Sequence, residues 1–167
     1  MYPLGDPVPD LIAPTARLRA AWLEAHAEWG PGVHEDGFGL LPSDDPHSPS
    51  GFAAWVARLA QPRCTYRWIV DGDQVLGGIA LRHEFDEFVR RAGHIGYGVR
   101  PSARGRGLAT WALGRMLDRA RALGLDRVLL VCEVDNLASA RTIEHHGGVL
   151  EGSPDEMRRY WIGLARR

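Results

Sequence analysis

Residues 94–109 carry the clearest chemical signature, His-Ile-Gly-Tyr-Gly-Val-Arg-Pro-Ser-Ala-Arg-Gly-Arg-Gly-Leu-Ala. A glycine-rich strand is expected over residues 93–100, after which Pro101 turns the chain and Gly105 and Gly107 open a helix. Exposed N–H groups at a helix start bind phosphate, and glycine lets the backbone approach it closely. Positive charge is added at the same place by Arg100, Arg104 and Arg106. The stretch therefore predicts a site for a phosphate-bearing ligand.

Two other phosphate-binding loops fit this stretch less well. A Walker A loop requires Gly-Lys-Ser/Thr after its glycines, and the sequence has none here. A dinucleotide fingerprint requires a third glycine, which is missing after both the 96/98 pair and the 105/107 pair. A glycine-rich turn that caps an ordinary helix remains open as an alternative.

The hydrophobic pattern predicts the elements that hold this loop. Helical spacing of apolar residues indicates helices over residues 15–29, 52–59, 108–123 and 137–146. Strands are expected over 66–70 and 75–81, joined by an Asp-Gly-Asp turn, and over 127–134 and 157–164. Residues 30–49, rich in Gly, Pro, Asp and Ser, indicate a long surface loop. The order of elements predicts a mixed α/β sheet of about six or seven strands.

Bulk composition narrows the class of protein. A chain of 167 residues suits one domain, and 20 Lys plus Arg against 21 Asp plus Glu argue against a nucleic-acid partner. No run reaches the roughly 18 apolar residues of a membrane helix, and the N-terminus does not resemble a signal peptide. We therefore expect a cytoplasmic protein with no membrane contact.

The cysteines and acidic side chains indicate no metal site. Cys64 and Cys132 lie in predicted strands, where buried thiols are the ordinary interpretation, and their spacing fits neither a disulfide framework nor zinc. A cluster of residues near position 85 also lacks metal-ligand spacing; it consists of His83, Glu84, Asp86 and Glu87.

The loop residues resemble a known family. The run Arg104-Gly-Arg-Gly-Leu-Ala is similar to the Arg/Gln-x-x-Gly-x-Gly/Ala signature of the GNAT superfamily of N-acetyltransferases. Downstream, a buried strand, then Asn136-Leu-Ala-Ser-Ala-Arg, then a helix ending at Gly147 match as well. The resemblance runs from about residue 15 to Leu164 and is closest to a little-described bacterial branch. It implies one acetyltransferase domain over residues 1–167, a mostly antiparallel sheet with about four helices, and a coenzyme-binding core at about 93–148.

The resemblance also implies a co-substrate, acetyl-CoA, and the residues that bind it. Backbone groups of residues 104–110 are expected to cradle the pyrophosphate, and the backbone at 97–99 to pair with the pantetheine arm as an added strand does. An N–H group there would also stabilise the oxyanion at the thioester carbonyl. The expected coenzyme-binding residues are Tyr97, Gly98, Val99, Arg104, Gly105, Arg106, Gly107, Leu108, Ala109, Thr110, Asn136, Ser139 and Arg141.

Acetyl transfer to an amine needs a base, because a free alkylamine has a pKa of about 10.4, and the leaving thiolate benefits from an acid. Many relatives carry an acidic Tyr seven residues after the motif Asn, where this sequence has Ile143. His94 is the first candidate base, with a structural strand histidine as the alternative. Glu133 is the second candidate base. Tyr160 and Tyr97 are candidate acids, with core packing as the alternative.

The acceptor is expected to be a small amine. Its binding is assigned to the loop at residues 30–49, whose His34, Glu35, Asp36, Asp44 and Asp45 suit a cation, although a mobile polar loop has the same composition. No Cys or Ser beside a base suggests a covalent intermediate, so transfer is expected to be direct. An acyl-CoA-binding module without turnover and a protein or peptide N-acetyltransferase remain alternatives. Many relatives dimerise through late strands, and the apolar residues 160–162 allow such a homodimer here.

Overall fold

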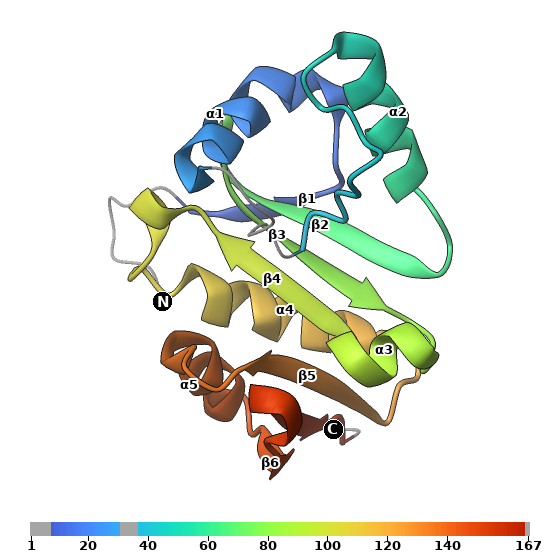
Figure 1. The fold of residues 1–167 in the computed structure, drawn as a ribbon, viewed down its shortest axis with the longest axis vertical. Coiled ribbons are helices and arrows are strands. Elements are labelled where there is room, and N and C mark those ends of the chain that lie inside the picture. The colour runs from blue at the N-terminus through green and yellow to red at the C-terminus, as the bar shows by residue number, and fades with distance from the viewer. Residues whose placement is uncertain (1–7, 31–36, 166–167) are drawn as a thin grey trace.

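Two antiparallel sheets organise the described part of the chain, residues 8–30 and 37–165 of the computed structural model (Figure 1). The first has the order β1-β2-β3-β4, formed by Asp10–Ile12, Cys64–Asp71, Gln74–Arg82 and Ile95–Val99. The second has the order β5-β7-β6, formed by Arg127–Glu133, Met157–Gly163 and Val149–Gly152. The predicted α/β fold, mostly antiparallel with about six or seven strands, is confirmed, and the seven strands of the described residues are divided between two sheets.

Five α-helices connect the strands in these residues: α1 (Arg19–Trp29), α2 (Pro49–Leu59), α3 (Glu87–Ala92), α4 (Leu108–Ala122) and α5 (Leu137–His145). Side-chain caps set several of their starts. The Ser48 side chain accepts the Gly51 N–H ahead of Pro49, so α2 begins before the predicted position 52. Asp86 accepts the Val89 N–H at the start of α3, a short helix between β3 and β4. None of the helices in the described residues is long and apolar enough to cross a membrane.

The first sheet separates two hydrophobic cores, because side chains alternate between its faces. One face packs against α1 and α2 through an aromatic cluster that includes Trp22, Trp55 and Trp68. The other face packs against α4, and this larger core continues into β5 and β7 of the second sheet. Helix α4 therefore joins the two sheets.

Two expectations about peripheral segments are wrong, and one short strand was missed. Phe38, inside the predicted surface loop, is 1% exposed and contacts Trp22 and Trp68, so this part of the loop belongs to a core. Strand β6 was not predicted, since four residues give too short a pattern. Because β6 pairs with β7, the apolar residues 160–162 lie in a central strand, and the edge available for dimer pairing belongs to β6 instead.

Candidate active site

The two sheets meet at one point and then diverge. Gly93 forms an isolated bridge with Leu130, and the His94 N–H donates to the Leu129 carbonyl at 2.7 Å. No other backbone hydrogen bond joins β4 to β5 in the part of the chain the structure describes. One edge of β4 pairs with β3 along residues 95–99, so its other edge faces the gap and has no strand partner there. We call this opening, between residues 96–99 and the end of β5, the wedge.

The loop after β4 leads into α4, whose first N–H groups have no hydrogen-bond acceptor among the described residues. Gly105 and Gly107 have φ of +79° and +75°, the left-handed region that favours glycine. Gly107 precedes α4 without a side-chain cap, and the N–H groups of Leu108, Ala109 and Thr110 meet no acceptor among the described residues. The site expected for a phosphate group is therefore open at the end of β4.

The arginines of this loop divide into two kinds. Arg104 and Arg106 are exposed, and Arg104 Nε donates to the Val99 carbonyl at 2.9 Å, which holds its side chain beside β4. Arg100, in contrast, is 7% exposed and points away from the loop. The expectation that Arg100 adds charge to the phosphate site is wrong, because its guanidinium is already neutralised by carboxylates of α1.

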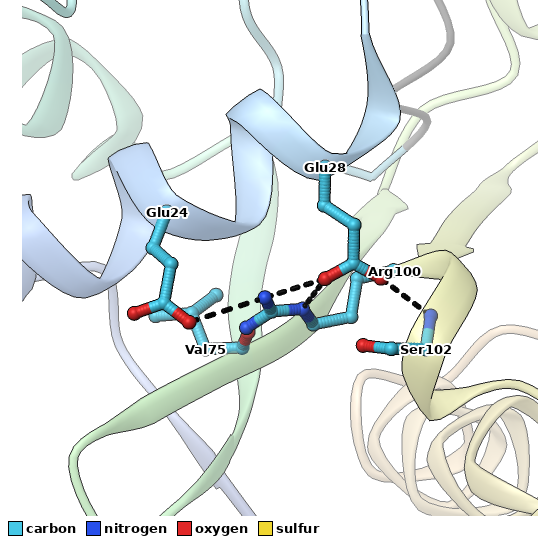
Figure 2. A network of polar contacts seen from close by, with 5 residues as sticks. All are labelled: Glu24, Glu28, Val75, Arg100 and Ser102. Atoms are coloured by element: carbon cyan, nitrogen blue, oxygen red, sulfur yellow. Dashed lines mark hydrogen bonds and ion pairs between the residues drawn. The ribbon is translucent and has the colours of Figure 1, made fainter.

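Figure 2 shows the network that holds Arg100. Its Nε donates to Glu28 at 2.7 Å, one terminal nitrogen lies 3.3 Å from Glu24, and another donates to the Val75 carbonyl. Glu28 also accepts the N–H of Ser102, at the start of the phosphate loop. Hydrogen bonds from Ser102, reinforced by Arg100, lower the pKa of Glu28 to about 2. Sequence reasoning missed Glu24 and Glu28; their spacing of four on a helix, facing a lone arginine, was the available signal.

The far side of the wedge is formed by the start of α5. The Asn136 side chain caps this helix by accepting the Ser139 N–H at 3.1 Å, and Arg141 is exposed. The Tyr97 hydroxyl lies 2.7 Å from Ser139 Oγ, so one side chain spans from β4 to α5. Ile143, one turn after Ser139, is 1% exposed and packs in the core. The structure thus brings Tyr97 and Ser139 together, a contact that sequence spacing does not reveal.

His94 lies at the junction of the sheets and is 4% exposed. Its Nδ1 accepts the Leu129 N–H at 2.8 Å, and its ring stacks on Phe85. A neutral imidazole with Nδ1 occupied carries its proton on Nε2. His94 can therefore take up a proton only by releasing Leu129. Burial, together with the charges of Arg82 and Arg127, lowers the pKa of His94 further.

The other two candidates for acid–base chemistry differ in exposure. Tyr160 is 1% exposed, and its hydroxyl donates to Glu144 at 2.6 Å; burial and this bond raise its pKa. Glu133 is exposed at the end of β5, and its carboxylate has no hydrogen-bond or ion-pair partner among the described residues. Cys132 and Leu130 face the larger core, so Glu133 faces the opposite side of the sheet from α4.

The acidic residues assigned to the acceptor are occupied elsewhere. Asp44 accepts the Leu41 N–H and pairs with Arg58, and Asp45 accepts the His47 N–H. Hydrogen bonds from Ser48 and His47 lower the pKa of Asp45. These two carboxylates stabilise the loop itself. The remaining three loop candidates lie outside the described residues; they are His34, Glu35 and Asp36.

Clusters with metal-binding composition are absent from the described residues. His83, from the cluster noted in the sequence, instead hydrogen-bonds Thr65 through Nε2 at 2.8 Å. Cys64 and Cys132 are both buried free thiols, as expected.

Comparison with known proteins identifies a family whose sequence pattern the chain matches. Residues 15–149 match the family model described as Acetyltransferase (GNAT) domain. No curated protein matches the chain by sequence. Among solved structures, Mycobacterium smegmatis RimJ in complex with CoA-disulfide is 21% identical with a TM-score of 0.74, covering 93% of this chain and 82% of the other.

Two further solved structures share the fold. Ribosomal-protein-S5-alanine acetyltransferase from Vibrio fischeri is 16% identical, with a TM-score of 0.72 over 93% of each chain. The putative acetyltransferase yncA from Salmonella typhimurium, solved with acetyl-CoA, is 17% identical, with a TM-score of 0.64 over 95% of each chain.

Proposed function

The chain belongs to the GNAT acetyltransferase family, and from this premise we propose that it transfers the acetyl group of acetyl-CoA directly to the amine of a small molecule. The observation that carries the proposal is the continuity of the wedge with the loop and α4. An unused strand edge offers hydrogen bonds to an extended pantetheine arm, and the helix start that follows it suits a pyrophosphate.

We assign the parts of acetyl-CoA to the described residues in chain order. The backbone of Tyr97, Gly98 and Val99 pairs with pantetheine, and an N–H of this edge donates to the thioester oxygen as negative charge develops there. The backbone from Arg104 to Thr110 receives the pyrophosphate, with the exposed side chains of Arg104 and Arg106 adding charge. Asn136, Ser139 and Arg141 line the opposite wall from α5. The coenzyme-binding core is thus residues 93–148.

We propose Tyr97 as the acid that protonates the leaving thiolate. Many relatives use a Tyr on the helix corresponding to α5, where this chain has the buried Ile143. The Tyr97 hydroxyl reaches the same helix one turn earlier, at Ser139, and so lies at the wall of the wedge. The Tyr97 side chain thus provides, from β4, the O–H group that α5 lacks.

We propose Glu133 as the base, acting through a water molecule. Its exposed carboxylate stands at the wide end of the wedge and faces the side of the sheet opposite α4, whereas the Tyr97 side chain packs towards α4. Base and acid therefore flank the wedge from opposite faces, so that the base can take a proton from the attacking amine while the acid protonates the thiolate that leaves the tetrahedral intermediate. His94 is the second candidate, with the added cost of breaking its bond to Leu129. Tyr160 holds α5 through Glu144.

The proposal is tested by following thiol release from acetyl-CoA with a panel of small amines, and acetylated product by mass spectrometry. We expect amine-dependent thiol release and a ternary-complex rate law, since no covalent acetyl-enzyme is formed. Tight acetyl-CoA binding with no turnover on any amine, peptide amines included, would favour a coenzyme-binding module. Turnover on peptides but not on small amines would move the acceptor to the protein class.

A further inference from the structure

Small residues line one face of β3 and β4 beside the wedge. In the register of β3 and β4, Gly78 lies opposite Gly98 and Ala80 opposite Gly96, and directly opposite residues point to the same face. This is the face that packs against α1 and α2, away from α4. Phe38 covers the Gly78 end of this strip, since a Cβ placed on Gly78 would lie 2.7 Å from its ring, whereas a Cβ placed on Gly96 would meet no atom closer than 3.7 Å.

Arg82 borders this strip. It lies on β3 two residues after Ala80, so its side chain is on the same face of the strand as Gly78 and Ala80, and this side chain extends over β4. A Cβ placed on Gly96 would lie 3.7 Å from both terminal nitrogens of Arg82 and 3.9 Å from the backbone nitrogen of Gly37. The point above Gly96 is thus flanked by a guanidinium and a backbone nitrogen.

Arg82 has no carboxylate partner within the described part of the chain. One terminal nitrogen donates to the Gly93 carbonyl at 3.0 Å, and the guanidinium lies 4.7 Å from the centre of the Phe88 ring. Arg100 and Arg159 pair with Glu28 and Glu151. The half-buried Arg19, Arg67 and Arg158 resemble Arg82 instead, because each donates to a backbone carbonyl and has no carboxylate partner among the described residues. A half-buried guanidinium left with one carbonyl retains donors in the fork geometry that matches a carboxylate.

We propose that Arg82 binds a carboxylate of the acceptor, so that the acceptor is a small amine that carries a carboxylate, such as an amino acid. The proposal rests on the proposed function, since it concerns the acceptor of that reaction. Gly96 immediately precedes Tyr97 on β4. A carboxylate held above Gly96 places an amine one or two bonds away at the opening of the wedge.

The experiment compares matched acceptors. A panel of L-amino acids, each paired with its α-carboxamide, is assayed for kcat/KM by thiol release with wild type, Arg82→Gln and Arg82→Lys. We expect wild type to prefer the acids, and Arg82→Gln to lower kcat/KM for the acids by about tenfold to a hundredfold with little change for the amides. Arg82→Lys retains the charge but loses the fork, so an intermediate loss is expected.

Two further variants separate recognition from structure. Arg90 also stacks on a phenylalanine, 4.6 Å from the Phe85 ring, but is exposed on α3, so Arg90→Gln is the matched control and should leave the preference unchanged. Gly96→Ala puts a methyl at van der Waals distance from Arg82 without strain and should reduce activity on the acids, with acetyl-CoA affinity retained.

A binding measurement accompanies the kinetics. The N-acetylated form of the best acid is titrated by calorimetry into each variant saturated with CoA, and Arg82→Gln should weaken this binding by a similar factor. Equal wild-type rates on acids and amides, or an equal loss on both in Arg82→Gln, would overturn the role of Arg82 while leaving the acetyltransferase function intact. Absence of turnover on both series, with acetyl-CoA still bound, would overturn the two proposals together.

Discussion

Gly107→Glu, with Gly124→Glu as its control, separates coenzyme binding from helix structure. The two glycines stand at opposite ends of α4, with φ of +75° and +84°, and a Cβ on either would have no neighbour within 4 Å in the described part of the chain. A side chain at either site therefore fits sterically but occupies the left-handed region, at a cost of about 1–2 kcal/mol. For a domain of this size that lowers Tm by roughly 2–8 °C.

The helix dipole makes the two variants unequal in stability. Glu is favoured at a helix N-terminus and disfavoured at a C-terminus, by about 0.3–1 kcal/mol in each case. Gly124→Glu should thus be the less stable variant. Gly107→Glu, in contrast, should bind acetyl-CoA more weakly than Gly124→Glu, because only position 107 faces the proposed pyrophosphate site.

The binding effect follows from Coulomb's law. A carboxylate about 6 Å from one phosphate charge costs about 1–3 kcal/mol at the effective dielectric of a protein surface, or roughly a fivefold to hundredfold rise in Kd. Calorimetric titration with acetyl-CoA measures it, and the difference should shrink at high salt because the charges are screened. Acetyl-pantetheine, which lacks the pyrophosphate, should be used equally by both variants. Equal losses of acetyl-CoA affinity in the two variants would refute the pyrophosphate site and leave the loop as a structural turn.

The remaining predictions concern the network in Figure 2 and the two tyrosines. Because the folded state lowers the pKa of Glu28 from 4.5 to about 2, its contribution to stability is present above pH 4.5 and is lost as the pH falls towards 2. Acid denaturation of Glu28→Gln, followed by circular dichroism, should therefore show a weaker pH dependence in that window than Glu24→Gln, whose site is more exposed; identical curves would contradict the network. Tyr97→Phe should lower kcat by roughly tenfold or more with acetyl-CoA affinity retained. Tyr160→Phe should mainly lower Tm, because it leaves the Glu144 carboxylate without its donor. Steady-state kinetics and thermal melts measure both effects; a loss of kcat in Tyr160→Phe together with a loss of Tm alone in Tyr97→Phe would make Tyr160 the acid and Tyr97 the structural residue.

The elements that position the site were predictable where the hydrophobic pattern is long. The helix at α4 was predicted within one residue of its end, since apolar residues repeat along its length and Gly124 terminates it. The β2–β3 hairpin was predicted from alternating apolar runs around Asp-Gly-Asp. Shorter elements such as β1 and β6 carry too few residues for a period to be visible.

Long-range contacts were not predictable from spacing. The partnership of Arg100 with α1 joins residues more than seventy positions apart, as does the hydrogen bond from Ser102 to Glu28. The contact of Tyr97 with Ser139 likewise depends on how the two sheets diverge. The local sequence pattern identifies residue types that suit a site, but the fold determines which of them are in contact. Arg100, for example, was expected to bind phosphate and instead has a structural role.

The two sheets are joined only at a narrow junction, so a coenzyme bound in the wedge beside it is expected to stabilise the folded chain. The amount of this protein in a cell should then depend on the concentration of its coenzyme. A ligand that fills the wedge and binds only the folded chain stabilises it by RT ln(1 + [L]/Kd), about 2.7 kcal/mol at a hundredfold excess over Kd. Substitutions that weaken acetyl-CoA binding then also enlarge the unfolded fraction that proteases degrade, by a factor that purified apoprotein does not reveal. A mutant with lost activity in vivo would accordingly need its abundance measured before the loss is assigned to chemistry.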